Sequence, residues 1–200
     1  PDEYINTTML IKSKGYQAEE HLVVTDDGYK LIVHRLPFGK NSDYKTADPN
    51  RPVVLLQHGL LDASSSWVIN FPDQSLGFIL ADAGYDVWLG NVRGNTYGRS
   101  HVKLDPSQDE FWDFSWSDMG EHDLPAMINY ITKQTGQAKI FYIGHSQGTL
   151  IAFSQLSKNQ ELSSKIRLFL ALGPVATAKY IKSPIKYLAQ IGAKSTQQIW

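Results

Sequence analysis

Four short, predominantly apolar runs constrain this chain more than any other feature of its sequence. They lie at residues 52–56, 85–89, 139–143 and 166–172. Strands without a polar–apolar alternation are typical of a parallel sheet whose two faces are both covered. Segments with helical spacing separate the runs, so we expect a mostly parallel, doubly wound α/β sheet with right-handed crossovers.

Two further runs predict an antiparallel hairpin at one edge of this sheet. Residues 21–25 and 30–36 are rich in β-branched side chains, and they flank Asp26-Asp27-Gly28, a cluster with turn chemistry. Helices are expected between the parallel strands at about 76–83, from about Asp123 to 135, and at 147–157. Gly84 and Gly136 come directly after the first two of these helices and are predicted to end them.

Size and composition exclude several classes of protein. The chain has 200 residues, a formal net charge of −1 and no cysteine. Phosphate binding requires a strongly basic face, and a net charge of −1 over one domain does not indicate one, so a nucleic-acid partner is not expected. A disulfide framework and a thiolate metal site are excluded, and no apolar run approaches the ~18–20 residues of a transmembrane span. The sequence indicates no particular oligomeric state.

The pentapeptide Gly144-His145-Ser146-Gln147-Gly148 comes after a predicted buried strand and precedes a predicted helix. In so tight a strand–turn–helix connection, side chains two residues before and after the serine would collide with the neighbouring elements. Gly144 and Gly148 remove those side chains, and the turn then presents the Ser146 hydroxyl at the carboxyl end of the sheet. Ser146 is therefore the candidate nucleophile.

The segment Gln57-His58-Gly59-Leu60-Leu61 comes directly after the first buried strand. In this architecture the loop after that strand and the residue after the nucleophile each supply one N–H group to an oxyanion hole. This assigns the backbone N–H groups of Leu60 and Gln147, with Gly59 allowing close approach. His145 points away from its neighbour's hydroxyl, so we interpret it as a packing or hydrogen-bonding residue.

Together these motifs resemble the amino-terminal half of an acid lipase of the gastric and lysosomal type, within the α/β-hydrolases. The resemblance implies hydrolysis of triacylglycerols or steryl esters at a lipid–water interface, without a metal or other cofactor, in a secreted or lysosomal protein. It covers residues 15–180 and rests on residues 57–61, 83–91, 93–95, 123–126 and 144–148.

The chain departs from this family in the residues that lie after the nucleophile. The α/β-hydrolase order is serine, then Asp or Glu, then histidine. After Ser146 the chain has no histidine and no aspartate, and Glu161 is its one acidic residue there. We therefore expect the triad Asp and His to lie beyond Trp200, and we expect the fragment alone to be inactive.

The same reasoning predicts a truncated fold. Residues 1–174 are assigned to the amino-terminal part of the α/β-hydrolase core, and residues 175–200 to the start of a cap or lid insertion. The last strands and most of the cap are expected outside the chain. Two alternatives remain open: a soluble thioesterase or carboxylesterase on the same fold, and a non-catalytic lipid-binding or storage protein derived from a lipase.

Several smaller features receive structural interpretations. Arg93 is predicted to pair with an acid such as Asp86 or Asp123. The Glu121-His122-Asp123 cluster lacks the spacing of a metal site, and Gly90, Gly94 and Gly98 lack the order of a dinucleotide loop. Four aromatic side chains are expected to pack in the core or against loops: Phe111, Trp112, Phe114 and Trp116.

One modification site is indicated. Asn6-Thr7-Thr8 is an N-glycosylation acceptor triplet, which is usable in a secretory compartment. The chain starts at Pro1 without an apolar leader, and we expect either a removed signal peptide or a fragment boundary before it.

Overall fold

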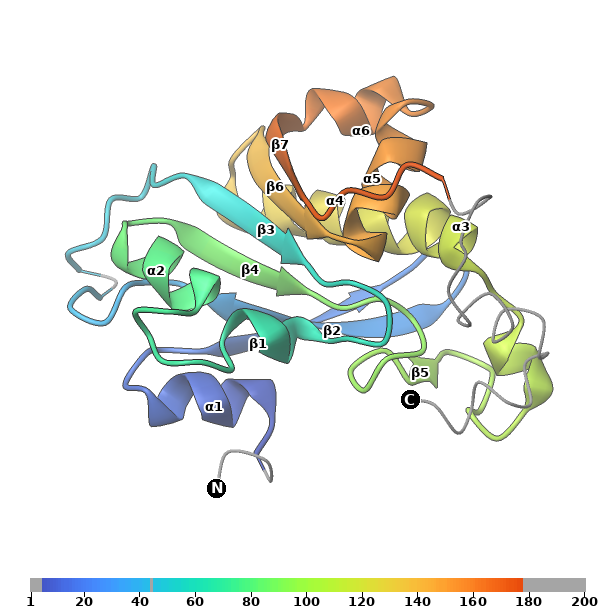
Figure 1. The fold of residues 1–200 in the computed structure, drawn as a ribbon, viewed down its shortest axis with the longest axis horizontal. Helices are drawn as coiled ribbons and strands as arrows, with labels where there is room; N and C mark the ends of the chain where they lie inside the picture. The colour runs from blue at the N-terminus through green and yellow to red at the C-terminus, as the bar shows by residue number, and fades with distance from the viewer. Residues whose placement is uncertain (1–4, 44, 178–200) are drawn as a thin grey trace.

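The computed structural model describes residues 5–43 and 45–177 and contains a seven-stranded sheet (Figure 1). The strands are β1 (Glu19–Val24), β2 (Tyr29–Leu36), β3 (Val53–Gln57), β4 (Asp86–Gly90), β5 (Ser100–His101), β6 (Ile140–His145) and β7 (Ile166–Leu172). Their order is β1-β2-β4-β3-β6-β7, and β5 pairs with β2 outside this path. β4, β3, β6 and β7 are parallel, whereas β2 is antiparallel to both β1 and β4. The predicted α/β sheet with a hairpin at one edge is confirmed.

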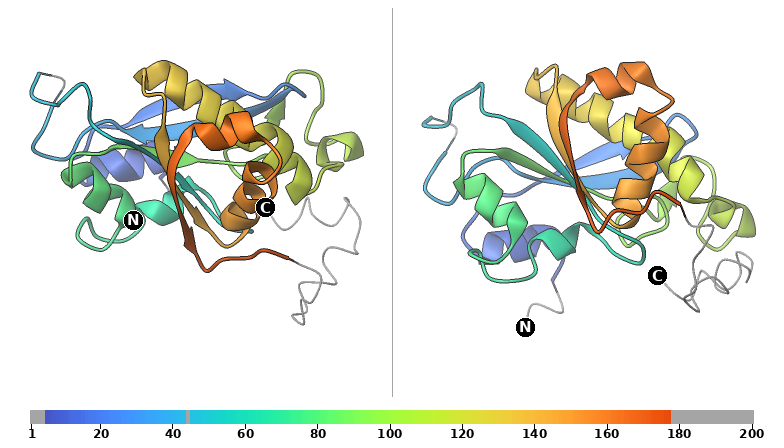
Figure 2. Two further views of the ribbon diagram at one scale, coloured as in Figure 1. Left: turned by 90° about the horizontal axis from the view of Figure 1, so that it is seen from above. Right: turned by 45° about the horizontal axis from the view of Figure 1, so that its top comes forward.

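Helices cover the sheet on both sides (Figure 2). The α-helices are α1 (Thr7–Ser13), α2 (Leu76–Asp82), α3 (Trp116–Asp118), α4 (Leu124–Thr135), α5 (Gln147–Leu156) and α6 (Gln160–Ser164). The connections also contain two 3₁₀ turns, η2 (Ser64–Trp67) and η3 (Asp109–Trp112), and one π-helical turn, η4 (Met119–Asp123).

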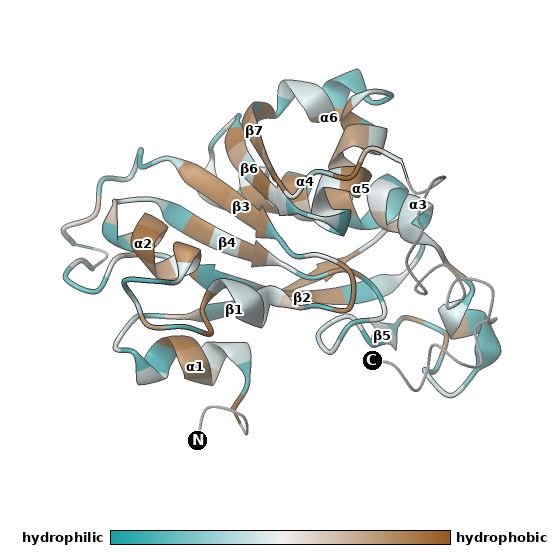
Figure 3. Cartoon of the chain, viewed as in Figure 1, coloured by the Kyte–Doolittle hydropathy of each residue, from teal (hydrophilic) through white to brown (hydrophobic). Residues whose placement is uncertain are grey.

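Side chains of the parallel strands alternate between two hydrophobic layers. Leu55 and Trp88 belong to the layer that packs on α4 and α5, while Leu56 and Leu89 belong to the layer that packs on α1 and α2. All four side chains are fully buried, and Figure 3 shows the hydrophobic colour along most of β3 and on part of β4. Burial on both faces explains why these strands lack alternation, since each buried large apolar side chain contributes roughly 1.5–3 kcal/mol.

Glycines end two of the predicted helices. Gly84 (φ 92°) lies just after α2 and Gly136 (φ 69°) just after α4, and both adopt the left-handed backbone conformation that glycine tolerates. The third predicted helix is α5. Neither α1 nor α6 is predicted from the sequence; the side chains of Asn6 and Asn159 cap their amino termini.

The assignment of residues 175–200 to a cap segment remains a prediction. Residues 178–200 lie outside the described part of the chain, and so does most of that segment. Among the residues that are described, no helix combines the length and the apolar character that crossing a membrane requires.

Candidate active site

Ser146 lies in the turn between β6 and α5, where its backbone conformation is unfavourable for any residue with a side chain. Its φ and ψ are 50° and −112°. Across residues 5–43 and 45–177, Leu61 is the other non-glycine residue with a positive φ. Such a conformation costs roughly 1–3 kcal/mol and persists when the surrounding structure enforces it. The chain therefore holds Ser146 in a strained turn.

Two glycines provide the space for this turn. A Cβ atom at Gly144 would lie 2.8 Å from the carbonyl carbon of Gly148. A Cβ atom at Gly148 would lie 2.6 Å from the carbonyl oxygen of Gln57. Both contacts involve backbone atoms that cannot rotate away, so a larger residue at either position would push β3, β6 or α5 apart.

The loop after β3 lies directly beside the turn. β3 and β6 are adjacent parallel strands with Gln57 opposite Gly144, so the chain leaves both strands at the same edge of the sheet. A Cβ atom at Gly59 would lie 3.2 Å from the Cβ of Ser146 and 3.0 Å from the Nδ1 of His145. This close approach seats the loop against Ser146.

The backbone N–H groups of Leu60 and Gln147 remain available as donors. Within the described part of the chain, neither of them donates to another backbone group. Gln147 is the first residue of α5, where N–H groups have no helical acceptor and carry the partial positive charge of the helix terminus. Both N–H groups thus lie at the edge of the sheet where β3 and β6 end, without a backbone acceptor among the described residues.

His58 is buried, and both of its ring nitrogens are hydrogen-bonded. Nδ1 lies 2.8 Å from the carbonyl oxygen of Gly59, and Nε2 lies 3.0 Å from the Nδ2 of Asn95. An amide nitrogen only donates, so Nε2 accepts and Nδ1 carries the proton. Desolvation by burial lowers the pKa of His58 below its ordinary value. His58 is therefore a neutral ring with a fixed tautomer.

None of the six histidines forms a hydrogen bond with Ser146 in the described structure. His145 is exposed, and its ring lies against Gly59 and Gly173. The predicted packing role of His145 therefore holds only in part, because the ring is not buried. The other five bond elsewhere: His21, His34, His58, His101 and His122.

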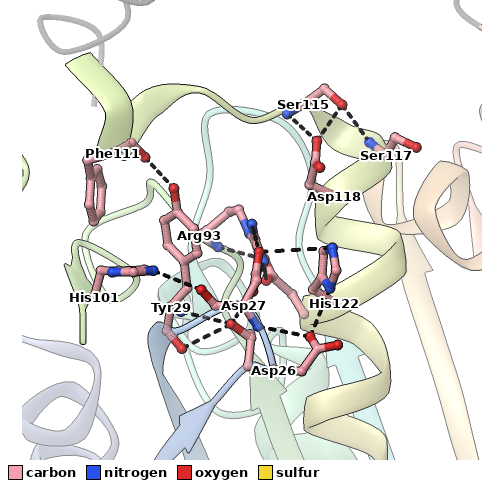
Figure 4. Close-up of polar contacts among 12 residues, drawn as sticks. Asp26, Asp27, Tyr29, Arg93, His101, Phe111, Ser115, Ser117, Asp118 and His122 are labelled. Atoms are coloured by element: carbon pink, nitrogen blue, oxygen red, sulfur yellow. Dashed lines mark hydrogen bonds and ion pairs between the residues drawn. The ribbon is translucent and has the colours of Figure 1, made fainter. Parts of the chain in front are cut away.

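Arg93, in the loop after β4, is buried among carboxylates (Figure 4). Its Nη1 and Nη2 donate to the two carboxylate oxygens of Asp27 at 2.6 and 2.9 Å, and its Nε donates to Asp123 at 2.9 Å. Of the two partners predicted from the sequence, Asp123 is observed. The predicted pairing of Arg93 with one of these acids is therefore confirmed, while Asp86 pairs with Arg35.

The two carboxylates respond to burial differently. Desolvation raises the pKa of the fully buried Asp123 to about 6, although the charge and hydrogen bonds of Arg93 act in the opposite direction. Desolvation also acts to raise the pKa of the partly exposed Asp27, but the hydrogen bonds from Arg93 and Thr25 outweigh it and lower that pKa. Both carboxylates are ionised at neutral pH.

Three side chains of this region could in principle hold a cation. Potential ligand atoms of Asp26, Asp27 and His122 lie within 4.8 Å of one another. However, both oxygens of Asp27 already accept from Arg93, and Nδ1 of His122 lies 2.8 Å from Asp26. We therefore group them with Arg93 and Asp123, and we refer to these five residues as the ionic network.

The aromatic cluster after residue 110 packs inward at three of its four positions. Phe111 and Trp112 are buried, and Phe114 packs against the same hydrophobic layer. Trp116, at the start of α3, is 38% exposed, so it is less covered than the other three.

Two family models match the chain. The model described as "alpha/beta hydrolase fold" matches residues 52–188, and the model described as "Partial alpha/beta-hydrolase lipase region" matches residues 7–71. The chain belongs to the α/β-hydrolase family. Its resemblance to lipases of the gastric type is also confirmed, by similarity to curated proteins that carry that name.

These relatives share about half of their aligned residues with the chain. Lipase member K of Mus musculus is 50% identical over 200 residues, which cover 100% of this chain and 50% of that protein. Gastric triacylglycerol lipase of Rattus norvegicus is 51% identical over 191 residues, covering 96% and 48%. Lipase lipl-5 of Caenorhabditis elegans is 51% identical over 190 residues, covering 94% and 47%. The chain spans about half the length of the curated relatives it matches.

Solved structures share the fold at lower identity. The thioesterase domain from the curacin biosynthetic pathway aligns with a TM-score of 0.56 and 18% identity, covering 92% of this chain and 55% of that one. Epoxide hydrolase VrEH1 from Vigna radiata aligns with a TM-score of 0.54 and 20% identity, covering 87% and 46%. At such identities the likeness shows the fold alone.

Proposed function

We propose that the protein containing this chain is a serine hydrolase that cleaves carboxylic esters of lipids, triacylglycerols or steryl esters, with Ser146 as its nucleophile. One observation carries the proposal: the strained turn at Ser146, which Gly144 and Gly148 make possible and which Gly59 contacts. Residues that their surroundings hold in an unfavourable backbone conformation cluster at active sites. The identity of about half to proteins named as lipases supports lipid esters as the substrate.

In the proposed reaction, the Oγ of Ser146 attacks the acyl carbonyl carbon while its proton passes to a histidine. The N–H groups of Leu60 and Gln147 donate to the oxyanion of the tetrahedral intermediate. Collapse of this intermediate breaks the ester C–O bond, and the histidine returns the proton to the departing alcohol. Water, deprotonated by the same histidine, then attacks the acyl-enzyme, and the histidine returns this proton to the Oγ of Ser146 as the bond to the fatty acid breaks. The scheme requires no cofactor.

We place the general base and its orienting carboxylate outside these 200 residues. In the described structure no histidine bonds to Ser146, and the α/β-hydrolase order puts both partners after the nucleophile. A serine without its base is a weak nucleophile, so the isolated chain is expected to lose about 10⁴–10⁶ in rate.

Exposed apolar side chains near the turn support a substrate at a lipid–water interface. Leu60 and Leu61 follow Gly59 in the loop beside Ser146 and are each 45% exposed. Adjacent apolar side chains that are exposed beside a site are a feature of surfaces that contact a partner or a lipid. We assign Leu60 and Leu61 to contact with the lipid surface.

A secreted or lysosomal location is part of the proposal, with Asn6 as a glycosylation site. Asn6 is exposed, and its Oδ1 accepts the N–H of Met9 at 2.8 Å to cap α1. The cap uses the oxygen of the amide, so the Nδ2 atom, to which a glycan attaches, is left for modification. Mass analysis of the secreted protein before and after removal of N-glycans tests this assignment.

Labelling with a fluorophosphonate tests the catalytic proposal on three proteins: the longer natural chain, its Ser146→Ala variant and the 200-residue chain. We expect mass analysis to find the label on Ser146 of the longer chain alone. Equal and rapid labelling of the 200-residue chain would assign the base to an upstream histidine. No labelling of either chain would contradict the proposal and favour a non-catalytic lipid carrier. Preference for dissolved short-chain esters over emulsions would favour a thioesterase or carboxylesterase.

A further inference from the structure

The structure assigns a role to Asn95: we infer that it is a positioning residue, which orients the Leu60 N–H toward the Ser146 turn by fixing the ring of His58. The inference rests on the proposed function, because it concerns the oxyanion hole of that reaction. Asn95 lies in the segment 93–95, outside the two motifs that form the Leu60 loop and the Ser146 turn, and it reaches the site from the loop after β4.

Asn95 is fully buried and holds the Leu60 loop at two points. Its Nδ2 lies 3.0 Å from the Nε2 of His58 and 3.3 Å from the carbonyl oxygen of Asp62. Its Oδ1 accepts the N–H of Tyr97 at 2.9 Å, which fixes the amide in its own loop. One side chain therefore ties both ends of the segment 58–62 to the neighbouring loop.

The hydrogen bond from Asn95 determines which nitrogen of His58 is protonated, and this in turn determines the hydrogen bond from His58 to Gly59. Because Asn95 donates to Nε2 of His58, the ring proton is on Nδ1, and Nδ1–H donates to the carbonyl oxygen of Gly59 at 2.8 Å. That carbonyl belongs to the same peptide unit as the Leu60 N–H. A peptide unit is planar and trans, so fixing the direction of its C=O also fixes the direction of its N–H. Asn95 thus sets the orientation of the proposed oxyanion donor through one imidazole and one peptide plane.

The side-chain amide of Asn91 fixes the orientation of the Asn95 amide. The Nδ2 of Asn95 also donates to the Oδ1 of Asn91 at 2.8 Å, and this oxygen accepts the N–H of Ser64 at 2.9 Å as well. The Nδ2 of Asn91 donates to the carbonyl of Ile32 in β2 at 2.7 Å. If the amide of Asn95 flipped, its oxygen would face three acceptors, the Nε2 of His58, the carbonyl oxygen of Asp62 and the Oδ1 of Asn91, so one arrangement is strongly preferred.

The network extends to a second buried histidine. The Oγ of Ser64 lies 2.9 Å from the Nδ1 of His34, and both side chains are fully buried. We refer to Asn95, Asn91, His58, Ser64 and His34 as the amide network. It connects the proposed oxyanion loop to β2 and η2 without a formal charge.

The inference is tested by comparing the hydrolysis rates of an oxo ester and a thiono ester, which differ only in the carbonyl oxygen or sulfur. An oxo ester develops an oxyanion that the two N–H groups stabilise, whereas a thiono ester develops charge on sulfur, a weak hydrogen-bond acceptor. Losing one oxyanion donor costs about 10²–10³ in kcat for the oxo ester. In the longer natural chain, Asn95→Asp keeps the shape of the side chain but removes the donor to His58, and Asn95→Ala removes the whole amide. We expect both variants to lower kcat with little change in KM, and to lower the oxo-to-thiono rate ratio at least about tenfold.

The control is Ile131→Ala, which removes a fully buried side chain of α4 outside the network. Thermal unfolding establishes that each variant is folded, and the control is expected to lower stability while leaving the rate ratio unchanged. Folded Asn95 variants that keep the wild-type ratio, or that lose both rates equally, would overturn the positioning role. If the wild type were inactive, or if Ser146→Ala kept full activity, the proposed function would fail and the inference with it, and that result is recognisable before any Asn95 variant is measured.

Discussion

Side chains of the loop after β4 belong to two different polar networks, one neutral and one ionic. Asn91 and Asn95 enter the amide network, in which every group is neutral. Arg93, between them in sequence, enters the ionic network with Asp27 and Asp123. The amide network orients one peptide unit beside the candidate site. The ionic network fastens together three segments that are distant in sequence.

The two networks contribute differently to the fold: buried amides orient neighbouring groups, whereas buried ion pairs stabilise the structure. An amide donates at one end and accepts at the other, so a chain of amides defines direction but contributes about 0.5–1.5 kcal/mol per bond. A buried ion pair orients its neighbours less strictly than a chain of amides does. Removing one partner, however, leaves an uncompensated charge and costs about 3–5 kcal/mol. Substitutions should therefore act on activity in the first network and on stability in the second.

The largest stability effect is expected from Arg93→Met. Asp123 has no exposed surface, and in this variant its charge would lose the only guanidinium that contacts it among the described residues. We expect a loss of about 3–5 kcal/mol in the free energy of unfolding, measured by urea denaturation of the protein. The double variant Arg93→Met with Asp123→Leu removes both charges and should recover most of it. A single variant within about 1 kcal/mol of wild type would show that the ionic network does not stabilise the fold.

An intermediate effect on stability is expected from His34, the member of the amide network farthest from the Leu60 loop, as the pH falls. Desolvation by burial lowers the pKa of His34 to about 4, so the folded protein keeps this ring neutral while the unfolded chain protonates near pH 6.5. The stability that depends on the neutral ring is fully present above pH 6.5 and is lost as the pH falls from 6.5 to 4, by at most about 3 kcal/mol.

The variant His34→Asn isolates this contribution, because its side chain does not titrate. Urea denaturation of both proteins at pH 7, 5.5 and 4 should show the wild type losing stability relative to the variant as the pH falls. Parallel losses in the two proteins would mean that His34 is protonated in the folded state, and the neutral amide network would then need revision.

The smallest effect is expected at the rim of the ionic network. The side chain of Asp26 is 78% exposed, and its carboxylate lies 2.8 Å from His122. Exposed pairs contribute about 0–1 kcal/mol and are screened by salt. Asp26→Asn should therefore change stability by less than about 0.5 kcal/mol, and 0.5 M NaCl should remove the difference. A larger, salt-resistant loss would place Asp26 among the buried members of the network.

Much of the fold could be predicted from the sequence because its strongest signals are local. The strands β3, β4 and β6 are apolar and largely buried on both faces, and glycines mark the ends of α2 and α4. The burial on both faces that was expected for the run 166–172 is not observed, because β7 has exposed residues along its whole length. α1 and α6 were missed because seven and five residues give too little periodicity to recognise. Their short apolar faces become meaningful only where Leu10, Ile11 and Leu162 meet the core.

In the candidate site too, local features could be predicted from the sequence, whereas contacts between distant segments could not. The turn at Ser146 could be predicted because its glycines are two residues away in sequence, and its steric requirement is local. The networks could not, because Asp27, Arg93 and Asp123 meet only after folding, and Asp27 has the sequence signature of an ordinary turn residue. One signal was available: polar side chains at positions 91, 93 and 95 come directly after a fully buried strand. Such residues must find partners inside the protein.

The backbone angles at position 146 also have a consequence for stability. Glycine adopts a φ of 50° without strain, so Ser146→Gly should make the folded chain more stable by an amount of order 1 kcal/mol. The same exchange removes the hydroxyl that the proposed reaction uses. At this position a more stable turn and the proposed chemistry therefore require different residues.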